Sequence, residues 1–361
     1  MVPNIVRHVN TEACFVLRPS LRRNERAVSE VLGVVMLLAM VITIMGGVWI
    51  FLTPYLSDFE DNTNWNSAVG ISERFQDRID VAGASPEGTG IRHTLALQAT
   101  YIRPIDKVET WTIAADLVPS EVVTLRHHNL TALGLDAQNE TARSITIETP
   151  RGIESVSFAA SHEEIMVRHN SSREHWMVVT VYDEAQTPLH RSLSYALSGI
   201  QITTSLGQGE HELALMNNAR VEHFPNEPWR VTSYPNVGLD QLVDGEYRLS
   251  MLLSDVTING SLGTGNSIGM NMLSLGPITL FTGQAYNLKF TVLNELNDVI
   301  TPQYHEHWLD EYNLNRASGT LDTFVGYGPF ERASGADGFT VDTHGIPLYL
   351  EVDVQRVEVS R

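Results

Sequence analysis

The chain has 361 residues, a formal net charge of −19 at pH 7 and one cysteine, Cys14. A disulfide framework and a thiolate zinc site both need several cysteines, so these classes are excluded. The acidic balance leaves no basic patch to neutralise phosphates, and we therefore expect no nucleic-acid partner.

Lysine is nearly absent, since only Lys107 and Lys289 stand against 22 arginines. An acidic surface depleted of lysine is typical of proteins adapted to high salt, where charge repulsion is screened. A GC-rich genome, which favours arginine codons, is an alternative explanation and is compatible with the first.

One long apolar segment determines how the rest of the chain is interpreted. Val31 to Leu52 comprises 22 residues without a charge, which would span roughly 33 Å as an α-helix. The hydrocarbon core of a bilayer is about 30 Å thick, so the segment is long enough to cross it. A cleaved secretory signal is the alternative, but its apolar core would be only about 7–15 residues long. We therefore predict a retained transmembrane helix.

Charged residues on both sides orient this helix. Three arginines precede it and three acidic residues follow it: Arg22, Arg23 and Arg26, then Asp58, Glu60 and Asp61. Positive charge stays on the cytoplasmic side, so the N-terminus is expected inside and the large C-terminal part outside the cell.

The residues before the apolar run, Arg26-Ala27-Val28-Ser29-Glu30, resemble the N-terminal signature of archaeal type IV pilins, particularly haloarchaeal ones. The resemblance implies that a prepilin-type peptidase cuts after Ala27 and leaves Val28 as the mature N-terminus. Arg26 would be a leader residue, and Glu30 would be the acidic residue at the start of the helix, where many family members have proline. Identical or related pilin subunits and the membrane are the partners that it implies.

Four regions follow from these patterns. They are a leader peptide (1–27), a transmembrane or pilin-type helix (28–57), an amphipathic helical continuation or stalk (58–81) and an extracellular β-rich domain (90–361). Removing the leader takes away five arginines and two glutamates, which changes the charge from −19 to −22.

The region 58–81 shows an approximate helical stripe of apolar residues, namely Trp65, Val69, Phe75 and Ile79. In pilin-like proteins the N-terminal helix continues into the globular domain and packs on a sheet, which this segment would match. A polar stalk with a short helix is the alternative. Pro54 is expected to kink the helix or to end it.

After a loop over 82–90 the apolar pattern changes to period two, which indicates β-strands. Strands are expected at 144–148, 177–182, 198–203, 212–216, 247–253, 256–258, 278–281, 288–293 and 347–359, and around Leu95–Tyr101 and Trp111–Ile113. Aromatic residues at every fourth position predict one late helix over Tyr304–Leu314. The predicted fold is mainly β: an N-terminal transmembrane helix followed by a large antiparallel β-sandwich-like ectodomain with one late helix.

The last strand changes phase. Apolar residues occupy alternate positions from Leu348 to Val354, and then Val357 and Val359 fall on the other parity. A regular strand would bury Arg356 and Glu358, which is costly for unpaired charges. We therefore predict a β-bulge near Gln355–Arg356, with an end of the strand at Val354 as the alternative.

The search for catalytic and metal-binding patterns finds little. The close histidine pairs are His127-His128 and His305 with His307, and neither spacing brings ligands together readily, so solvated histidines are expected. No nucleophile elbow or complete calcium loop is present. We expect no metal, no cofactor and no enzymatic activity.

Four Asn-x-Ser/Thr sequons are candidate N-glycosylation sites in polar, turn-like contexts. They begin at Asn129, Asn139, Asn170 and Asn259.

We expect a type IV pilin-like cell-surface subunit, processed by a prepilin-type peptidase and anchored or assembled through its N-terminal helix, with a role in surface adhesion or filament structure. The alternative is a non-polymerising surface protein that binds ligand while held by a single membrane helix.

Overall fold

The computed structural model describes most of the chain beyond residue 23. The described residues are 24–97, 100–119, 123–128, 132–137, 141–159, 165–169, 175–241, 246–260, 262, 267–311, 338–341 and 347–361. They form two compact units, divided between Glu60 and Asp61, and the helix α1 contributes to both.

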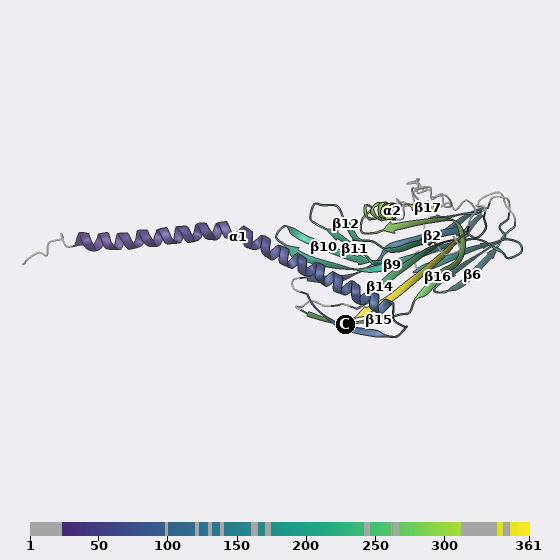
Figure 1. Ribbon diagram of the computed structural model, residues 1–361, viewed down its shortest axis with the longest axis horizontal. Coiled ribbons are helices and arrows are strands. Elements are labelled where there is room, and N and C mark those ends of the chain that lie inside the picture. The colour runs from purple at the N-terminus through teal and green to yellow at the C-terminus, as the bar shows by residue number, and fades with distance from the viewer. Residues whose placement is uncertain are drawn as a thin grey trace, which may run out of the picture. The chain divides into compact units, whose positions relative to one another are not determined.

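Within the described residues, the elements in chain order are two helices and eighteen strands (Figure 1). They are α1 (Asn24–Gly83), β1 (Gly90–Ala96), β2 (Thr100–Asp116), β3 (Val123–His128), β4 (Ala132–Ala137), β5 (Ser144–Thr149), β6 (Gly152–Ser157), β7 (Ile165–Arg168), β8 (Trp176–Tyr182), β9 (Pro188–Leu206), β10 (Gly209–Met216), β11 (Ala219–His223), β12 (Arg230–Ser233), β13 (Asn236–Gln241), β14 (Tyr247–Asn259), β15 (Ser267–Ser274), β16 (Ile278–Asn294), α2 (Ile300–Glu311), β17 (Gly338–Val341) and β18 (Leu348–Ser360).

The predicted fold class is confirmed: the protein is mainly β, with one long apolar N-terminal helix and one short late helix. The helix α1 does not end at Pro54 but continues to Gly83. The predicted helical continuation over 58–81 is therefore also present. Four residues of the expected leader, 24–27, belong to the helix as well.

Fifteen strands form one connected sheet, and its main path runs β1-β15-β18-β16-β2-β9-β10-β11-β12. The strand β16 links its two halves, because its first part pairs with β18 and its second part pairs with β2. The pairing of β14 with β18 is parallel, and the other pairings among the described strands are antiparallel. The sheet folds over itself in this way, so that β13, β14 and β18 face β2 and β9 across a core.

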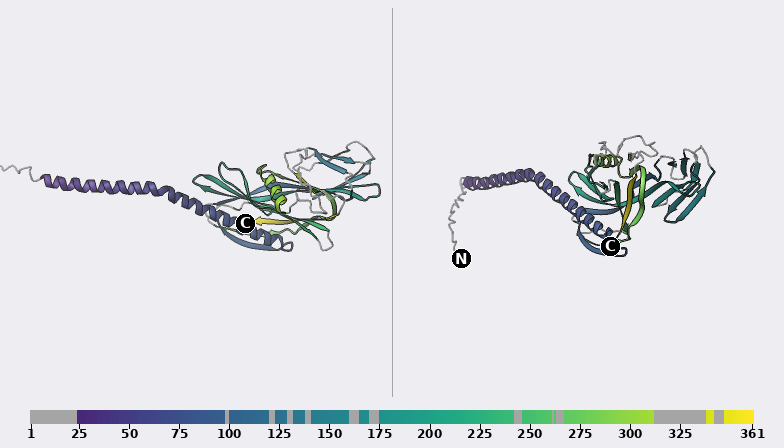
Figure 2. Two further views of the ribbon diagram at one scale, coloured as in Figure 1. Left: turned by 45° about the horizontal axis from the view of Figure 1, so that its top comes forward. Right: turned by 45° about the vertical axis from the view of Figure 1, so that its right-hand side comes forward.

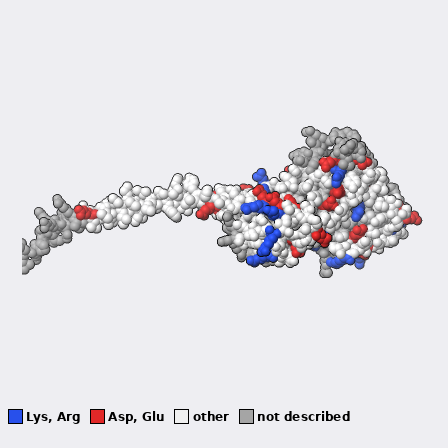
Figure 3. Space-filling view, turned by 60° about the horizontal axis from the view of Figure 1, so that its bottom comes forward, with Lys and Arg blue, Asp and Glu red and all other residues white. Residues whose placement is uncertain are grey.

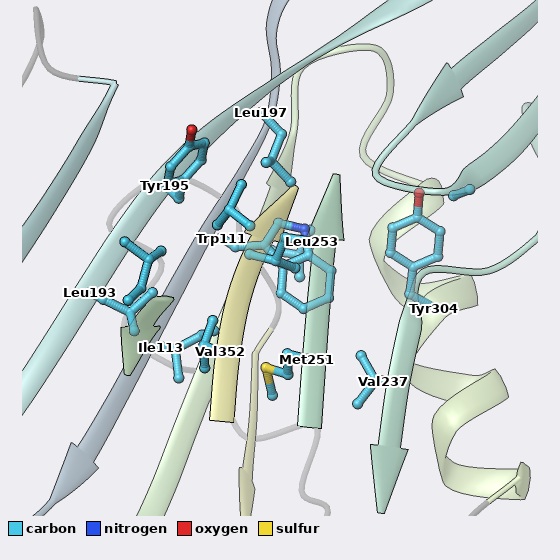
Figure 4. Close-up of a cluster of buried hydrophobic side chains, with 14 of the residues drawn as sticks. Trp111, Ile113, Leu193, Tyr195, Leu197, Val237, Met251, Leu253, Tyr304 and Val352 are labelled. Carbon is cyan, nitrogen blue, oxygen red and sulfur yellow. The ribbon is translucent and has the colours of Figure 1, made fainter. Parts of the chain in front are cut away.

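The largest hydrophobic cluster fills the space between these two halves. Figure 4 shows Met251 and Leu253 of β14 and Val352 of β18 opposite Trp111 and other side chains of β2 and β9. Trp111 is fully buried and its ring lies 5.5 Å from that of Trp308 in α2, centroid to centroid. Burial of large apolar side chains contributes about 1.5–3 kcal/mol each, so this cluster stabilises the contact between the two halves of the sheet.

A second cluster lies on the opposite face of the sheet, under the ectodomain part of α1. Ile71, Phe75 and Ile79 of α1 pack against β1, β9, β10, β15 and the end of β18, and both views in Figure 2 show the helix lying along these strands. The spacing of the three residues places them on one side of the helix, which is why this part of α1 docks on a sheet.

Three polar contacts fix the position of this helical segment on the ectodomain. The backbone N–H of Gly207 donates to the Asp61 carboxylate at 3.0 and 2.9 Å. Gln76 Nε2 donates to the carbonyl of Asn218 at 2.8 Å, and Arg220 pairs with Glu73 at 3.2 Å.

A third, smaller core joins the three-stranded sheet β3-β4-β7 to the face formed by β5 and β8. Leu133 and Leu135 of β4 pack there with Ile145 and Ile147 of β5. This part of the ectodomain is therefore also a two-layer β structure.

The helix α2 covers one edge of the large sheet. Gln303 Oε1 accepts the backbone N–H of Val231 in β12 at 2.9 Å, and Gln303 Nε2 donates to the carbonyl of Trp229 at 3.0 Å. An unpaired edge strand is a template for unwanted strand addition, and the side-chain amide of Gln303 occupies that position here.

The predicted β-bulge at Gln355–Arg356 is wrong. β18 pairs with β14 without a shift through Arg356, and Val357 and Val359 are nevertheless buried. The reason is that the two halves of β18 bury opposite faces: Leu348–Val354 faces the core between the two halves of the sheet, and the two valines face the core under α1. Arg356 is accommodated because its guanidinium donates to the carbonyls of Leu275 and Gly276.

Several expected strand boundaries are also corrected. The segments 247–253 and 256–258 belong to one strand, β14, and 278–281 and 288–293 belong to β16. The late helix begins at Ile300 and ends at Glu311, so it starts one turn earlier than expected, and Leu314 lies outside the described residues.

Candidate functional site

The most distinctive surface is the apolar segment of α1 before the ectodomain, from Val31 to Phe59. Its large apolar side chains are 42–76% exposed. The helix α1 is the one described helix that is long and apolar enough to span a membrane, by length and composition. Figure 3 shows this part of the helix uncharged over most of its length, with acidic side chains at its two ends, where the sequence has Glu30 and Asp58.

Two hydroxyl groups inside this segment are satisfied within the helix. The hydroxyls of Thr43 and Thr53 donate to the carbonyls of Ala39 and Trp49, each at 2.7 Å. A hydroxyl bonded to the preceding turn presents less unsatisfied polarity to an apolar environment. The surface of the segment can therefore be covered by hydrocarbon or by other apolar helices.

The expected leader cleavage residues, Arg26, Ala27 and Val28, all lie in the first turns of α1. Their side chains are outside the described part of the structure. Glu30 follows them as an exposed residue at the start of the apolar segment. The peptide bond between Ala27 and Val28 is helical, so a peptidase that binds extended backbone would have to unwind this turn.

Of the four candidate glycosylation sites, Asn259 alone is described. It is exposed at the end of β14, and its Nδ2 donates to Glu358 Oε1 at 3.4 Å. Gly260 follows with a φ of +84°, which makes a turn directly after the acceptor. Asn129, Asn139 and Asn170 lie outside the described residues.

Two arginines lie one turn apart on the ectodomain part of α1. Arg74 and Arg78 are both exposed, and neither makes an ion pair with a described residue. Arg74 Nε donates to the carbonyl of Gly70 at 2.9 Å. Next to them on β1, the pKa of His93 is lowered by burial first and then by the charges of Arg78 and Arg74. Asp77 and Asp80 are also exposed on this part of α1, and Figure 3 shows basic and acidic side chains intermixed on the ectodomain.

The core contains a fully buried carboxyl group, Glu109 of β2. Burial raises its pKa to about 7, and nearby donors oppose the shift. Asn294 Nδ2 donates to Glu109 Oε1 at 3.4 Å, and the side chains of Trp111, Tyr304 and Asn217 present further donors. Glu109 therefore connects β2, β16, α2 and the turn after β10 at one polar point inside an apolar core.

A second buried carboxylate, Asp255 of β14, lies beneath a partly exposed histidine. It accepts the backbone N–H of Ser198 at 2.8 Å and the hydroxyl of Tyr195 at 3.2 Å. Burial raises its pKa. His175 Nε2 lies 4.0 Å from Asp255 Oδ2, and its ring stacks over that of Tyr195. The hydrogen bonds tie β9 to β14 across the core, which is a structural role.

A third buried pair joins β9 to β2: His190 Nδ1 and Asp116 Oδ1 are 2.9 Å apart, and Asn287 Nδ2 donates to Asp116 Oδ2 at 3.1 Å. These three residues satisfy each other where β2, β9 and β16 meet. No nucleophilic side chain among the described residues is bonded to this histidine.

The histidines singled out from the sequence behave differently from one another. His305 is buried, so the expectation that it is solvated is wrong, and burial lowers its pKa to about 4. His307 points elsewhere and stacks on Tyr234 at 3.7 Å between ring centroids. The side chains of His127 and His128 are outside the described residues. In the described part of the chain, no group of three or more His, Cys, Asp or Glu residues is arranged to hold a metal ion.

Sequence reasoning missed Glu109, although a signal existed. Glu109 has the same parity as Trp111 and Ile113 in β2, so period-two alternation places it on the buried face. The Asp255 and His190 pairs had no such signal, because their partners come from strands distant in sequence.

The fold and the exposed segment together define a class: a β-sandwich-like domain with an apolar N-terminal helix that continues into it. Comparisons with protein-family models, with curated proteins and with solved structures find no match to this chain.

Proposed function

We propose that this chain is a type IV pilin-like cell-surface subunit. A prepilin-type peptidase removes residues 1–27, and the mature chain is anchored or assembled through α1, with a role in surface adhesion or filament structure. The observation that supports this most is the change along α1 itself: the helix is apolar and exposed up to Phe59 and amphipathic from Asp61, where it packs on the ectodomain.

The proposal assigns a separate task to each part of α1. The segment Val31–Phe59 is held in the membrane before assembly and packs with equivalent helices of other subunits after assembly. The segment from Asp61 to Gly83 attaches the β domain to that helix through the core under α1. In the assembled state Glu30 pairs with the free amino group of Val28 in a neighbouring subunit, because an unpaired carboxylate near hydrocarbon is costly.

The test is the N-terminal residue of the protein isolated from its cells, determined by mass spectrometry. We expect Val28. An intact Met1 terminus, or cleavage beyond Leu52, would refute the pilin-like assignment. Arg26 and Ala27 can be probed with bulky or acidic replacements, which should leave the leader attached, whereas Asn259→Gln should not change processing.

The second candidate is a surface-binding protein that stays a monomer on one membrane helix. It is favoured by the length of the apolar segment, which alone suffices to cross a bilayer. Filaments sheared from cells separate the two candidates: they contain this protein in the first case and lack it in the second.

A further inference from the structure

The exposed apolar segment of α1 is longer than the hydrocarbon core of a bilayer is thick. From Val31 to Phe59 there are 29 residues, which extend over roughly 44 Å as a helix, whereas the hydrocarbon core measures about 30 Å. To fit the whole segment into the core, the helix would have to tilt by about 46°, and membrane helices tilt by about 0–40°. About nine residues of the segment are therefore expected outside the hydrocarbon.

The distribution of side chains indicates which end of the segment lies outside. All four aromatic residues of the segment are among its last 11 positions: Trp49, Phe51, Tyr55 and Phe59. Trp and Tyr are enriched at membrane–water interfaces, because their rings are apolar while their N–H and O–H groups are polar. Asp58 belongs to the same end, and a carboxylate inside hydrocarbon is costly. Both observations place the C-terminal end of the segment beyond the hydrocarbon.

Three aromatic side chains at this end are uncovered in the described structure. Trp49, Phe51 and Tyr55 are 69%, 66% and 61% exposed. The rings of Phe51 and Tyr55 lie one turn apart, with their centroids separated by 5.5 Å. Trp49 projects from nearly the opposite side of the helix, since two residues correspond to about 200° of rotation. The three rings are therefore spread around the helix within about 9 Å of its length, close to the 5–7 Å or so that the interfacial layer occupies on each side of a bilayer.

We propose that Trp49, Phe51 and Tyr55 bind the interfacial layer of the bilayer, with Val31–Ile50 in the hydrocarbon core, and that these rings set the depth of α1 in the membrane. The inference rests on the membrane anchoring that both candidate functions require. Lipid is the partner rather than a second copy of the chain, because the rings gather at the level where the segment leaves the hydrocarbon. Packing between membrane helices favours small residues instead.

The acidic residues beyond the rings agree with this placement and restrict the kind of lipid contact. Asp58 lies eight residues after Ile50, which puts its carboxylate roughly 12 Å beyond the hydrocarbon and in water. Asp58 and Glu60 are both exposed, so attraction to anionic headgroups does not contribute. The contact depends on the rings, and the depth of α1 should be the same in phosphatidylcholine vesicles with and without phosphatidylglycerol.

Fluorescence quenching in proteoliposomes measures this depth. The full chain with Cys14→Ser carries one fluorophore at Ser57→Cys, and lipids with a nitroxide at known depths quench it. Ser57 lies seven residues after Ile50, so we expect its fluorophore roughly 10 Å outside the hydrocarbon. A second chain carries the fluorophore at Gly46→Cys, where open space surrounds the added side chain. This fluorophore should report a position inside the hydrocarbon.

Replacement of the rings tests whether they set the depth. Trp49→Leu, Phe51→Leu and Tyr55→Leu together keep the surface apolar and remove its preference for the interface. All three side chains are exposed, so no buried contact is lost. We expect the Ser57 fluorophore to move toward the hydrocarbon by at least roughly 3 Å, the rise of two residues. The matched control replaces three exposed methionines of the same helix with leucine and should leave the depth unchanged: Met36, Met40 and Met45.

The outcomes separate the role of the rings from membrane anchoring. If the aromatic variant keeps the wild-type depth while the Gly46 fluorophore stays inside the hydrocarbon, the proposal is refuted and anchoring stands. A shift that disappears when the protein is diluted in lipid would assign the rings to contacts between copies and refute lipid as the partner. A depth that changes with phosphatidylglycerol would contradict a contact made by the rings alone. A Gly46 fluorophore in water would refute membrane anchoring, and with it both candidate functions.

Discussion

The buried carboxyl of Glu109 should make the stability of the ectodomain depend on pH. Its pKa is raised from 4.5 to about 7 by burial. The folded state therefore binds this proton more tightly than the unfolded state does. When the pKa of a group is higher in the folded state, the stability that it contributes is fully present below the pKa of the unfolded state. This stability is lost as the pH rises through the pKa of the folded state. The window for Glu109 runs from about pH 4.5 to about pH 7.

The size of the effect follows from the shift. Each pKa unit corresponds to about 1.4 kcal/mol, so a shift of roughly 2.5 units represents about 3 kcal/mol. Glu109→Gln removes this titration while keeping the shape of the side chain. Its amide introduces donors toward Asn294 and Tyr304, so the test compares how the free energies of unfolding of variant and wild type change with pH. Between pH 4 and pH 8, the difference in the free energy of unfolding between variant and wild type should change by about 3 kcal/mol in favour of the variant.

Denaturant unfolding of the detergent-solubilised chain measures this difference, with tryptophan fluorescence as the signal because Trp111 and Trp308 lie in the same core. Other buried groups also titrate, including Asp255 and His305, and comparison with wild type at each pH cancels their contribution. Glu184→Gln, on an exposed turn, is the matched control. Parallel stability curves for wild type and Glu109→Gln would refute the reasoning.

Three further predictions concern packing, salt and modification. Gly199→Ala should destabilise the ectodomain by about 1–3 kcal/mol in the same unfolding assay, because its Cβ would lie 2.5 Å from the carbonyl oxygen of Leu215. The control is Gly269→Ala, which has open space around the added Cβ and should change stability by less than about 1 kcal/mol. Thermal melts should rise with salt between about 0.1 and 2 M as charge repulsion is screened, and a melting temperature independent of salt would contradict the expected adaptation. Asn259→Gln should reduce the mass of the protein isolated from cells by one glycan, and an unchanged mass beyond the substitution itself would show that this sequon is unused.

The sequence predicted the parts of the fold that depend on local patterns. The apolar run gave the long helix, and the stripe from Trp65 to Ile79 indicated correctly that it continues beyond Pro54. Alternation of apolar and polar residues located β5, β8 and β18 within one residue at each end. These features are set by neighbours in sequence, so they can be recognised without knowledge of the tertiary structure.

Features that depend on distant partners were not predictable in this way. The phase change in β18 was taken for a bulge, because one buried face was assumed for the whole strand. Its neighbour β14 changes face at the same level, with Leu253 in one core and Val256 in the other. The first parts of these two strands bury one face and their last parts bury the opposite face, each in a different core. No local pattern distinguishes that arrangement from a bulge.

The same reasoning applies to α1, where the environment changes along one continuous helix. Monomeric soluble proteins rarely expose apolar patches larger than a few hundred Å². The exposed residues from Val31 to Phe59 surround the whole helix rather than one face. A helix that is apolar on all sides needs a covering on all sides, which a bilayer or a bundle of equivalent helices provides and docking on a single groove does not. The amphipathic part from Asp61 onward needs a covering on one side only, and the sheet of its own ectodomain supplies it.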